Sequence, residues 1–290
     1  VITPALFEKE ELQKYNSQFQ GVRTISKLIS PAIAGVLMLK FNINSIFFIN
    51  SASFLLLFLS ILISYIPDQE HKENGNDDIK EIFVGFKENF TNIKLRITLL
   101  FTIVVNIAML GFNATIIYYL QDQLKLSNSL VGIVYSIAGF GSLIAVTFLS
   151  TFLNKKDAFI LMNISMATIP LVIMASGIVE NWIFFGICYS ILSGLITIAS
   201  VSITTIQQQE STVYNIGKIL SSSFVIATIF APFGGILAAY FNWLLNPRLS
   251  LVILGLLSSL LVILIKSYEK KLIKKSTAIS VSYTHLTLPT

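Results

Sequence analysis

The polar side chains that could do chemistry in this sequence are few, and they lie inside long apolar runs. Asn106 and Asn113 are seven residues apart, so they share one face of a helix. Four hydroxyl residues recur every three or four positions further along: Ser193, Thr197, Ser200 and Thr204. An asparagine in hydrocarbon is costly unless paired, which favours inward placement of both amides. Such groups offer hydrogen bonds to a ligand, although hydroxyls can instead bond carbonyls of their own helix.

Patterns for catalysis or metal binding do not accompany these residues. The sequence has no P-loop and no metal-ligand spacing, and neither His71 nor His285 has a plausible nucleophile or metal partner nearby in sequence. Cys188 is the sole cysteine, so no intrachain disulfide and no cysteine metal cluster can form. We therefore expect no enzyme activity, no cofactor and no ATP-driven pumping by this chain.

The apolar runs that carry these residues have the length of membrane spans. A hydrocarbon core of about 30 Å needs roughly 20 mostly apolar residues in a helix. Stretches of this kind lie at 22–39, 43–66, 97–120, 130–153, 158–178, 182–205, 218–241 and 249–265. With 54% hydrophobic and 12% charged residues, the chain has too little polar surface for a soluble globule. The sequence predicts an all-α transmembrane protein with eight spans.

Lysine and arginine collect in alternate connections between these spans. Sixteen of the 20 lie at the N-terminal segment, after the second, fourth and sixth spans, and after the last span, whereas Lys40, Lys125 and Arg248 lie on the other side. Lys27 falls within the first span and is expected to snorkel to the lysine-rich surface. The positive-inside rule then places both termini in the cytoplasm. The net charge of +5 follows this sidedness and forms no basic stripe among exposed aromatics, so nucleic-acid binding is not expected.

A long charged connection at 67–96 divides the chain. Two spans lie before it, in residues 1–66, and six lie after it, in 97–270. Within it, Ile79, Phe83, Phe86 and Phe90 recur at helical spacing between charged residues. This pattern predicts an amphipathic helix, lying either on the membrane surface or against the ends of neighbouring spans. The tail at 271–290 follows, and its last ten residues, VSYTHLTLPT, resemble translated adaptor DNA and are excluded as non-native.

An internal repeat relates the two parts. SPAIAGVL at 30–37 and APFGGIL at 231–237 place a proline before small residues, Pro31 with Gly35 and Pro232 with Gly234 and Gly235, six spans apart. Polar residues precede both, with Glu11, Gln13 and Asn16 before the first and Gln207, Gln208 and Glu210 before the second. The agreement in spacing and flanking chemistry predicts duplicated six-span halves.

At these residues the sequence resembles the major facilitator superfamily, most closely its multidrug and macrolide efflux branch. The stretch from Pro4 to Phe7 through Glu10, Leu12 and Asn16 is similar to the family segment entering its fifth helix, and Gly217-Lys218 is similar to the step opening its eleventh. The resemblance implies that the spans are helices five to twelve of twelve. The chain, which starts at Val1 without a methionine, is then expected to lack helices one to four.

Efflux members of this family carry a glycine-rich antiporter motif in the fifth helix. Its positions fall here at Ser17, Ser26, Ser30-Pro31 and Ala34-Gly35, all of them small or proline. Small residues allow close helix approach and the proline permits bending, which suits a moving interface, although ordinary packing remains an equal alternative. Small pairs at Gly132/Ser136, Ser190/Gly194, Gly234/Ala238 and Gly255/Ser259 are assigned to packing.

The resemblance implies a secondary transporter in a bacterial cell membrane that exports a small amphipathic compound by exchange with protons. Asn106, Asn113 and the hydroxyl stripe would fall on helices seven and ten, which line the family's central cavity. Every Asp and Glu lies in a connection or at a span end, so the proton-carrying acid is expected in the absent helices. A non-transporting membrane scaffold or receptor, or a nutrient importer of the same fold, remain the alternatives.

Overall fold

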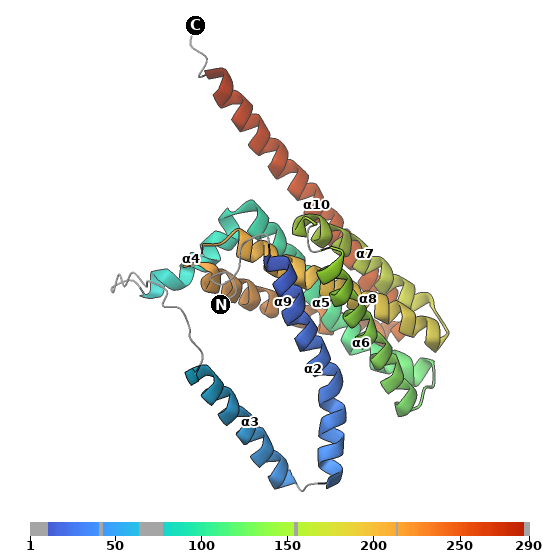
Figure 1. Ribbon diagram of the computed structural model, residues 1–290. Coiled ribbons are helices and arrows are strands. Elements are labelled where there is room, and N and C mark those ends of the chain that lie inside the picture. The colour runs from blue at the N-terminus through green and yellow to red at the C-terminus, as the bar shows by residue number, and fades with distance from the viewer. Residues whose placement is uncertain (1–10, 41–42, 64–77, 154–155, 213, 287–290) are drawn as a thin grey trace.

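Apolar runs of span length fold as helices throughout the part of the chain that the structure describes. The computed structural model describes residues 11–40, 43–63, 78–153, 156–212 and 214–286, and every regular element in these ranges is helical (Figure 1). The elements are α2 (Leu12–Lys40), α3 (Ile43–Ile63), α4 (Asp78–Thr91), α5 (Ile93–Tyr118) with a π-helical extension η1 (Tyr119–Gln123), α6 (Asn128–Thr151), α7 (Ala158–Ile178), α8 (Trp182–Gln209), α9 (Ile216–Leu244) and α10 (Pro247–Leu286). The predicted all-α class is confirmed.

Seven of these helices are long and apolar enough to cross a membrane. They are α3 and the six helices from α5 to α10, and each overlaps one of the predicted spans. The span at 97–120 ends in η1, the one at 130–153 runs two residues beyond α6, and the one at 43–66 runs beyond α3. Its last residues, 64–66, lie outside the described part of the chain. The remaining predicted span, 22–39, lies within α2, which is helical through Lys40.

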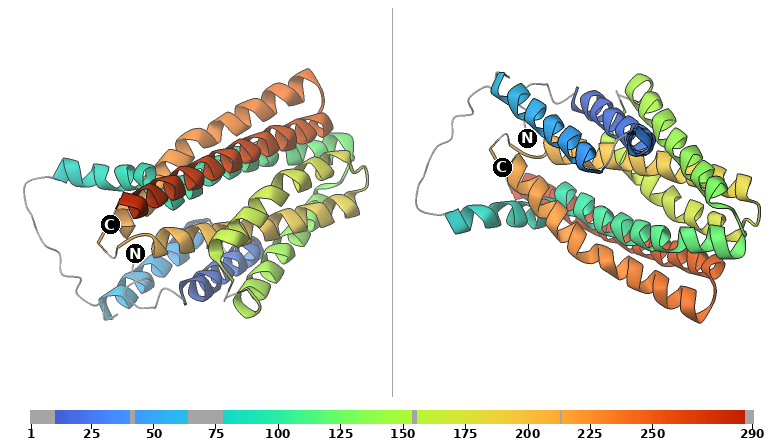
Figure 2. Two further views of the ribbon diagram at one scale, coloured as in Figure 1. Left: turned by 90° about the horizontal axis from the view of Figure 1, so that it is seen from above. Right: turned by 90° about the horizontal axis from the view of Figure 1, so that it is seen from below.

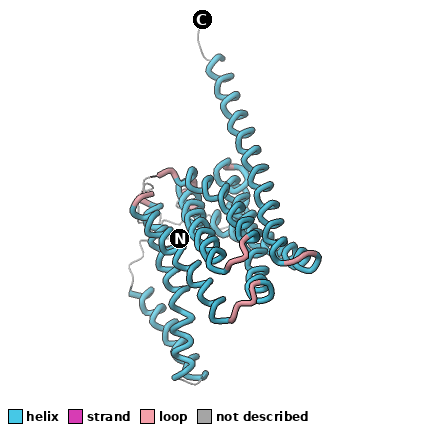
Figure 3. Tube along the Cα trace, turned by 90° about the vertical axis from the view of Figure 1, so that its right-hand side faces the viewer, coloured by secondary structure: helices cyan, strands magenta, loops and turns pink. Residues whose placement is uncertain are grey.

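Short polar residues set where the helices begin. Asn92 accepts hydrogen bonds from the N–H groups of Lys94 and Leu95, and Ser127, Asp157 and Asn181 cap α6, α7 and α8 in the same way. These caps satisfy backbone donors that the first helical turn leaves free. The loops that end at these capping residues are short, as Figure 3 shows.

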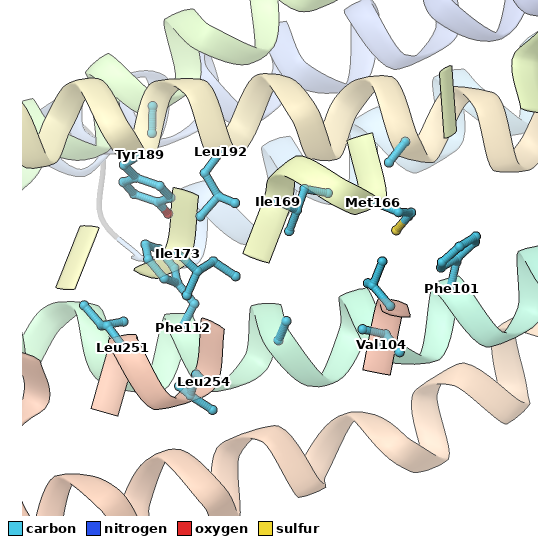
Figure 4. Close-up of a cluster of buried hydrophobic side chains, with 14 of the residues drawn as sticks. Phe101, Val104, Phe112, Met166, Ile169, Ile173, Tyr189, Leu192, Leu251 and Leu254 are labelled. Carbon is cyan, nitrogen blue, oxygen red and sulfur yellow. The ribbon is translucent and has the colours of Figure 1, made fainter. Parts of the chain in front are cut away.

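The six helices from α5 to α10 pack into one bundle. Helix α8 lies between α6 and α7, α5 packs against α9 and α10, and α10 also packs against α7 (Figure 2). Figure 4 shows Phe101, Val104 and Phe112 of α5 directed toward α7 and α8 in the buried core. Helix α3 instead has no buried residue over Asn44–Ile63, and most of its side chains are exposed.

Glycines mark the closest helix crossings. A Cβ added at Gly234 of α9 would lie 1.9 Å from the carbonyl oxygen of Ile107 in α5, and one at Gly141 of α6 would lie 2.0 Å from that of Ser190 in α8. A Cβ at Gly255 of α10 would lie 2.3 Å from the Met174 side chain of α7. The packing assignment is thus confirmed for Gly234 and Gly255 but wrong for Gly132, which has nothing within 4 Å, and the crossing at Gly141 was not predicted.

The predicted amphipathic helix forms as α4, and it packs against the start of α9, as the second of the two predicted positions requires, whereas contact with the membrane surface stays a prediction. Its polar side packs on α9, where a Cβ at Gly85 would meet the Lys218 carbonyl oxygen at 2.1 Å and the Asn89 amide donates to the Ile219 carbonyl at 3.0 Å. Phe83 and Phe90 are 61% and 52% exposed. The aromatic side of α4 therefore faces away from the bundle. At the other end of the chain, α10 projects beyond the bundle and its helix includes 281–286 of the suspected non-native tail.

Candidate functional site

The two asparagines of α5 lie on one exposed face. Asn113 is exposed and Asn106 half-buried, in line with exposed Leu110 and Ile117. Next to this face, Ile107 and Gly111 pack on α9, and Phe112 on the other side stacks against Phe185 of α8 with ring centroids 6.4 Å apart. The two amides therefore lie on the side of α5 between its contacts with α8 and α9, and this side faces away from α7 and α10. Neither amide has a hydrogen-bond partner among the described residues.

The hydroxyl stripe of α8 is less uniform. Thr197 is 3% exposed and donates to the Ser193 carbonyl at 2.9 Å, and Thr204 donates to the Ser200 carbonyl at 2.9 Å. The Ser193 carbonyl also accepts from Ser142 of α6 at 3.2 Å. Both threonines therefore bond their own helix, the alternative foreseen from the sequence. Ser200 is the one stripe residue whose side chain is exposed.

An aromatic cluster lies between α5, α6 and α8 and was not singled out from the sequence. Tyr189 of α8 packs on Phe112 at 5.2 Å and on Tyr135 of α6 at 5.6 Å between ring centroids, and Phe185 packs on Tyr119 at 5.2 Å. The signal was available in the four-residue spacing of Phe185 and Tyr189, which places both rings on one face. Tyr135, half-buried, is the member of this cluster nearest to an open surface.

Helix α2 joins the bundle through a buried polar contact. The Asn16 amide donates to Thr205 Oγ1 at 3.0 Å and also to Gln208 Oε1, and all three side chains are at least nine-tenths buried. Gln13 donates to the Leu153 carbonyl at the end of α6 at 2.9 Å. The sequence had marked Gln13, Asn16 and Gln208 as flanks of the repeat without predicting that they meet.

The polar contact continues across the bundle to α4. Gln207 donates to Ser223 of α9 at 3.1 Å, and Ser223 donates to Asn89 Oδ1 of α4 at 2.9 Å. Lys94, at the start of α5, forms an ion pair with Glu210 at 2.7 Å. These bonds connect α2, α8, α9 and α4 at the end of the bundle that carries most of the lysines.

The positions matched to the antiporter motif differ in burial. Ser17 is fully buried in the contact, and a Cβ at neighbouring Gly21 would lie 2.9 Å from Val146 of α6. Ser26 is exposed and donates to the Val22 carbonyl. The side chains of Ser30, Pro31, Ala34 and Gly35 lie outside the described set. In the repeat-equivalent helix α9, Gly234 packs on α5, Gly235 lies beside Leu110 and Pro232 is exposed.

Among the residues that the structure describes, no group of three or more His, Cys, Asp or Glu side chains could hold a metal ion. The chemistry of the candidate site is that of amide and hydroxyl hydrogen bonds beside aromatic rings.

Comparison with known proteins decides the family. The Major Facilitator Superfamily model matches residues 1–220. The chain belongs to the major facilitator superfamily. Macrolide efflux protein A of Streptococcus pyogenes is 24% identical over 244 residues, covering 83% of this chain and 60% of the relative. The protein of the same name from Enterococcus faecalis is 23% identical over 237 residues, covering 80% and 73%.

The fold of this facilitator is also similar to a solved structure. A bacterial homologue of the iron transporter ferroportin, crystallised in its outward-facing state, superposes with a TM-score of 0.65 at 16% identity, over 92% of this chain and 65% of that one. The chain thus spans about 60% of the Streptococcus pyogenes relative and 65% of the solved structure. It is a multispanning membrane protein of the facilitator fold.

Proposed function

We propose that this facilitator is a secondary transporter that exports a small amphipathic compound, of the macrolide kind, in exchange for protons. Membership of the family supports transport, and the relatives named macrolide efflux protein A support export and the class of compound. The observation in the structure that carries the proposal is the face of α5 with Asn106 and Asn113.

This face suits a compound that is mostly apolar with a few polar groups. Leu110 and Ile117 offer apolar contact beside the two amides, and each amide has both donors and an acceptor. Ligand sites in proteins combine apolar walls with few convergent polar groups in the same way. Ser200 of α8 and Tyr135 of α6 add a hydroxyl and a ring within the same bundle.

The contact of α2 supports alternating exposure of this face. Asn16, Gln13 and Gly21 hold the first turns of α2 against α6 and α8, whereas Figure 1 shows the helix leaving the bundle toward α3. We infer that this contact holds the lysine-rich end closed. Substrate entry from the lysine-rich side requires α2 to move away from α8, which breaks the Asn16 hydrogen bonds.

Export is tested by measuring accumulation of a radiolabelled macrolide in bacterial cells with and without the protein. We expect lower accumulation in expressing cells and loss of that difference after a proton uncoupler is added. Equal accumulation, with the protein present in the membrane fraction, contradicts macrolide export. Export that persists after the uncoupler is added contradicts proton exchange but leaves macrolide export supported.

A further inference from the structure

A groove between α7 and α10 lies on the outside of the bundle. It has a volume of ≈ 320 Å³, at the low end of the range for small-molecule sites. Its lining residues come from these two helices: Ala167, Leu171, Ser259, Val262, Ile263, Lys266, Ser267 and Lys270. Since α5 turns its buried face toward α7 and α10, the groove lies opposite the asparagine face. It is therefore separate from the proposed transport path.

The groove is polar at one end and apolar along the rest. Lys266, Ser267 and Lys270 lie at the end nearest the lysine-rich side, and Val262, Ile263 and Leu171 form the apolar length. Leu171 and Ile263 are 57% and 60% exposed, so the apolar part opens to the surrounding lipid.

The length of the groove matches one leaflet of a bilayer. Ser259 and Lys270 are eleven residues apart on α10, which is about 16 Å along a helix. Half of a hydrocarbon core of about 30 Å is nearly the same distance. The apolar part of the groove is therefore long enough for an acyl chain whose headgroup lies at Lys270.

The lysines are placed to bind an anion at the interface. Lys266 donates to Glu269 at 3.0 Å and lies 5.9 Å from the ring centre of Phe101, which fixes the ammonium beside the groove. An ammonium has three donors, so two remain after the Glu269 bond. Lys270 is exposed and lines the same end of the groove.

We propose that this groove binds an anionic phospholipid, with its phosphate at Lys266 and Lys270 and an acyl chain against Leu171 and Ile263. Basic pockets between membrane helices on the side facing an anionic leaflet bind such headgroups. A zwitterionic lipid carries the same chains without net charge and binds less well.

Native mass spectrometry of the protein from nanodiscs of equimolar dioleoylphosphatidylglycerol and dioleoylphosphatidylcholine tests this site. Lys270→Gln removes an exposed lysine of the groove, and Lys271→Gln removes the same charge from the adjacent position, which does not line it. We expect Lys270→Gln to weaken retention of phosphatidylglycerol about fivefold, and Lys271→Gln to leave it nearly unchanged.

A second variant tests the shape of the groove without changing charge. Ala167→Trp fills the apolar part and should lower phosphatidylglycerol retention while all lysines remain. Equal losses in the Lys270 and Lys271 variants indicate unspecific attraction of anionic lipid and overturn the proposal. Retention that Ala167→Trp does not change overturns it as well. Neither outcome bears on macrolide export, since the groove lies away from the transport path.

Discussion

At the level of single residues, Asn106 and Asn113 were expected to point into a cavity because an unpaired amide is costly in hydrocarbon, and this inward placement stays a prediction. The seven-residue spacing predicted a shared face, and the structure places both amides on the exposed face of α5. The hydroxyl stripe shows the limit of that argument. A threonine hydroxyl can bond its own helix, and Thr197 and Thr204 do so, which spacing cannot reveal.

Replacing Asn106 or Asn113 with Ala should reduce efflux of a fluorescent substrate, since each amide offers the compound a hydrogen bond. The expected loss in kcat/KM is about fivefold for each residue. Thr168→Ala serves as a control, because that hydroxyl bonds its own helix in α7 at 2.9 Å. Membrane expression is measured by immunoblot. Unchanged efflux in the double variant removes both residues from the site.

Gly234 and Gly132 give a matched pair for packing. Gly234→Ala places a methyl group where the Ile107 carbonyl oxygen already lies, so α5 and α9 must separate, at a cost on the order of 1–3 kcal/mol. Gly132→Ala meets open space. In thermal unfolding in detergent, Gly234→Ala should lower the melting temperature by about 2 °C or more relative to the unsubstituted protein, and Gly132→Ala should leave it unchanged. Equal melting temperatures contradict the close approach of these helices.

At the level of elements, α2 and α4 differ from what periodicity suggested. The spacing of Phe83, Phe86 and Phe90 predicted α4 and its aromatic side, but the contact with α9 uses Gly85 and Asn89 on the other side. Helix α2 likewise extends ten residues before the predicted span, and this polar part makes the contact with α8. Hydropathy finds the apolar length of a helix and misses polar turns that are buried by other helices.

The Asn16 contact should hold the lysine-rich end closed. In a Cys188→Ser background, Ser17→Cys provides a single buried thiol inside this contact. Adding Asn16→Ala removes the bonds to Thr205 and Gln208, so labelling by a membrane-impermeant maleimide from the lysine-rich side should rise about threefold or more. Gln18→Ala, on the exposed side of α2, should not change the rate. Equal rates in all three proteins show that the contact does not keep this end closed.

At the level of the whole molecule, sidedness rests on the distribution of lysines. Lys125 lies in the turn between η1 and α6, and Lys72 lies outside the described residues. Single cysteines at these positions should react from opposite compartments, Lys72→Cys from the cytoplasm and Lys125→Cys from outside. Reaction of both from one compartment contradicts the predicted topology.

Seven of the eight spans could be predicted because each apolar run is long and bounded by charged or capping residues, such as Asp157 before α7 and Asn181 before α8. The arrangement of helices could not, because it depends on close crossings such as Gly141 with Ser190, whose partners are distant in sequence. The repeat around Pro31 and Pro232 predicted two halves, which stays a prediction, and it indicated neither the bond from Asn16 to Thr205 nor the groove between α7 and α10.

Alternating exposure of the α5 face is tested most directly by two single cysteines in proteoliposomes, both in the Cys188→Ser background. Ser17→Cys reports the lysine-rich end, and Ile117→Cys, half-exposed on the asparagine face, reports the opposite end. When a macrolide is added, labelling at Ser17→Cys should rise while labelling at Ile117→Cys falls. Labelling that changes in the same direction at both positions, or at neither, contradicts the transport mechanism.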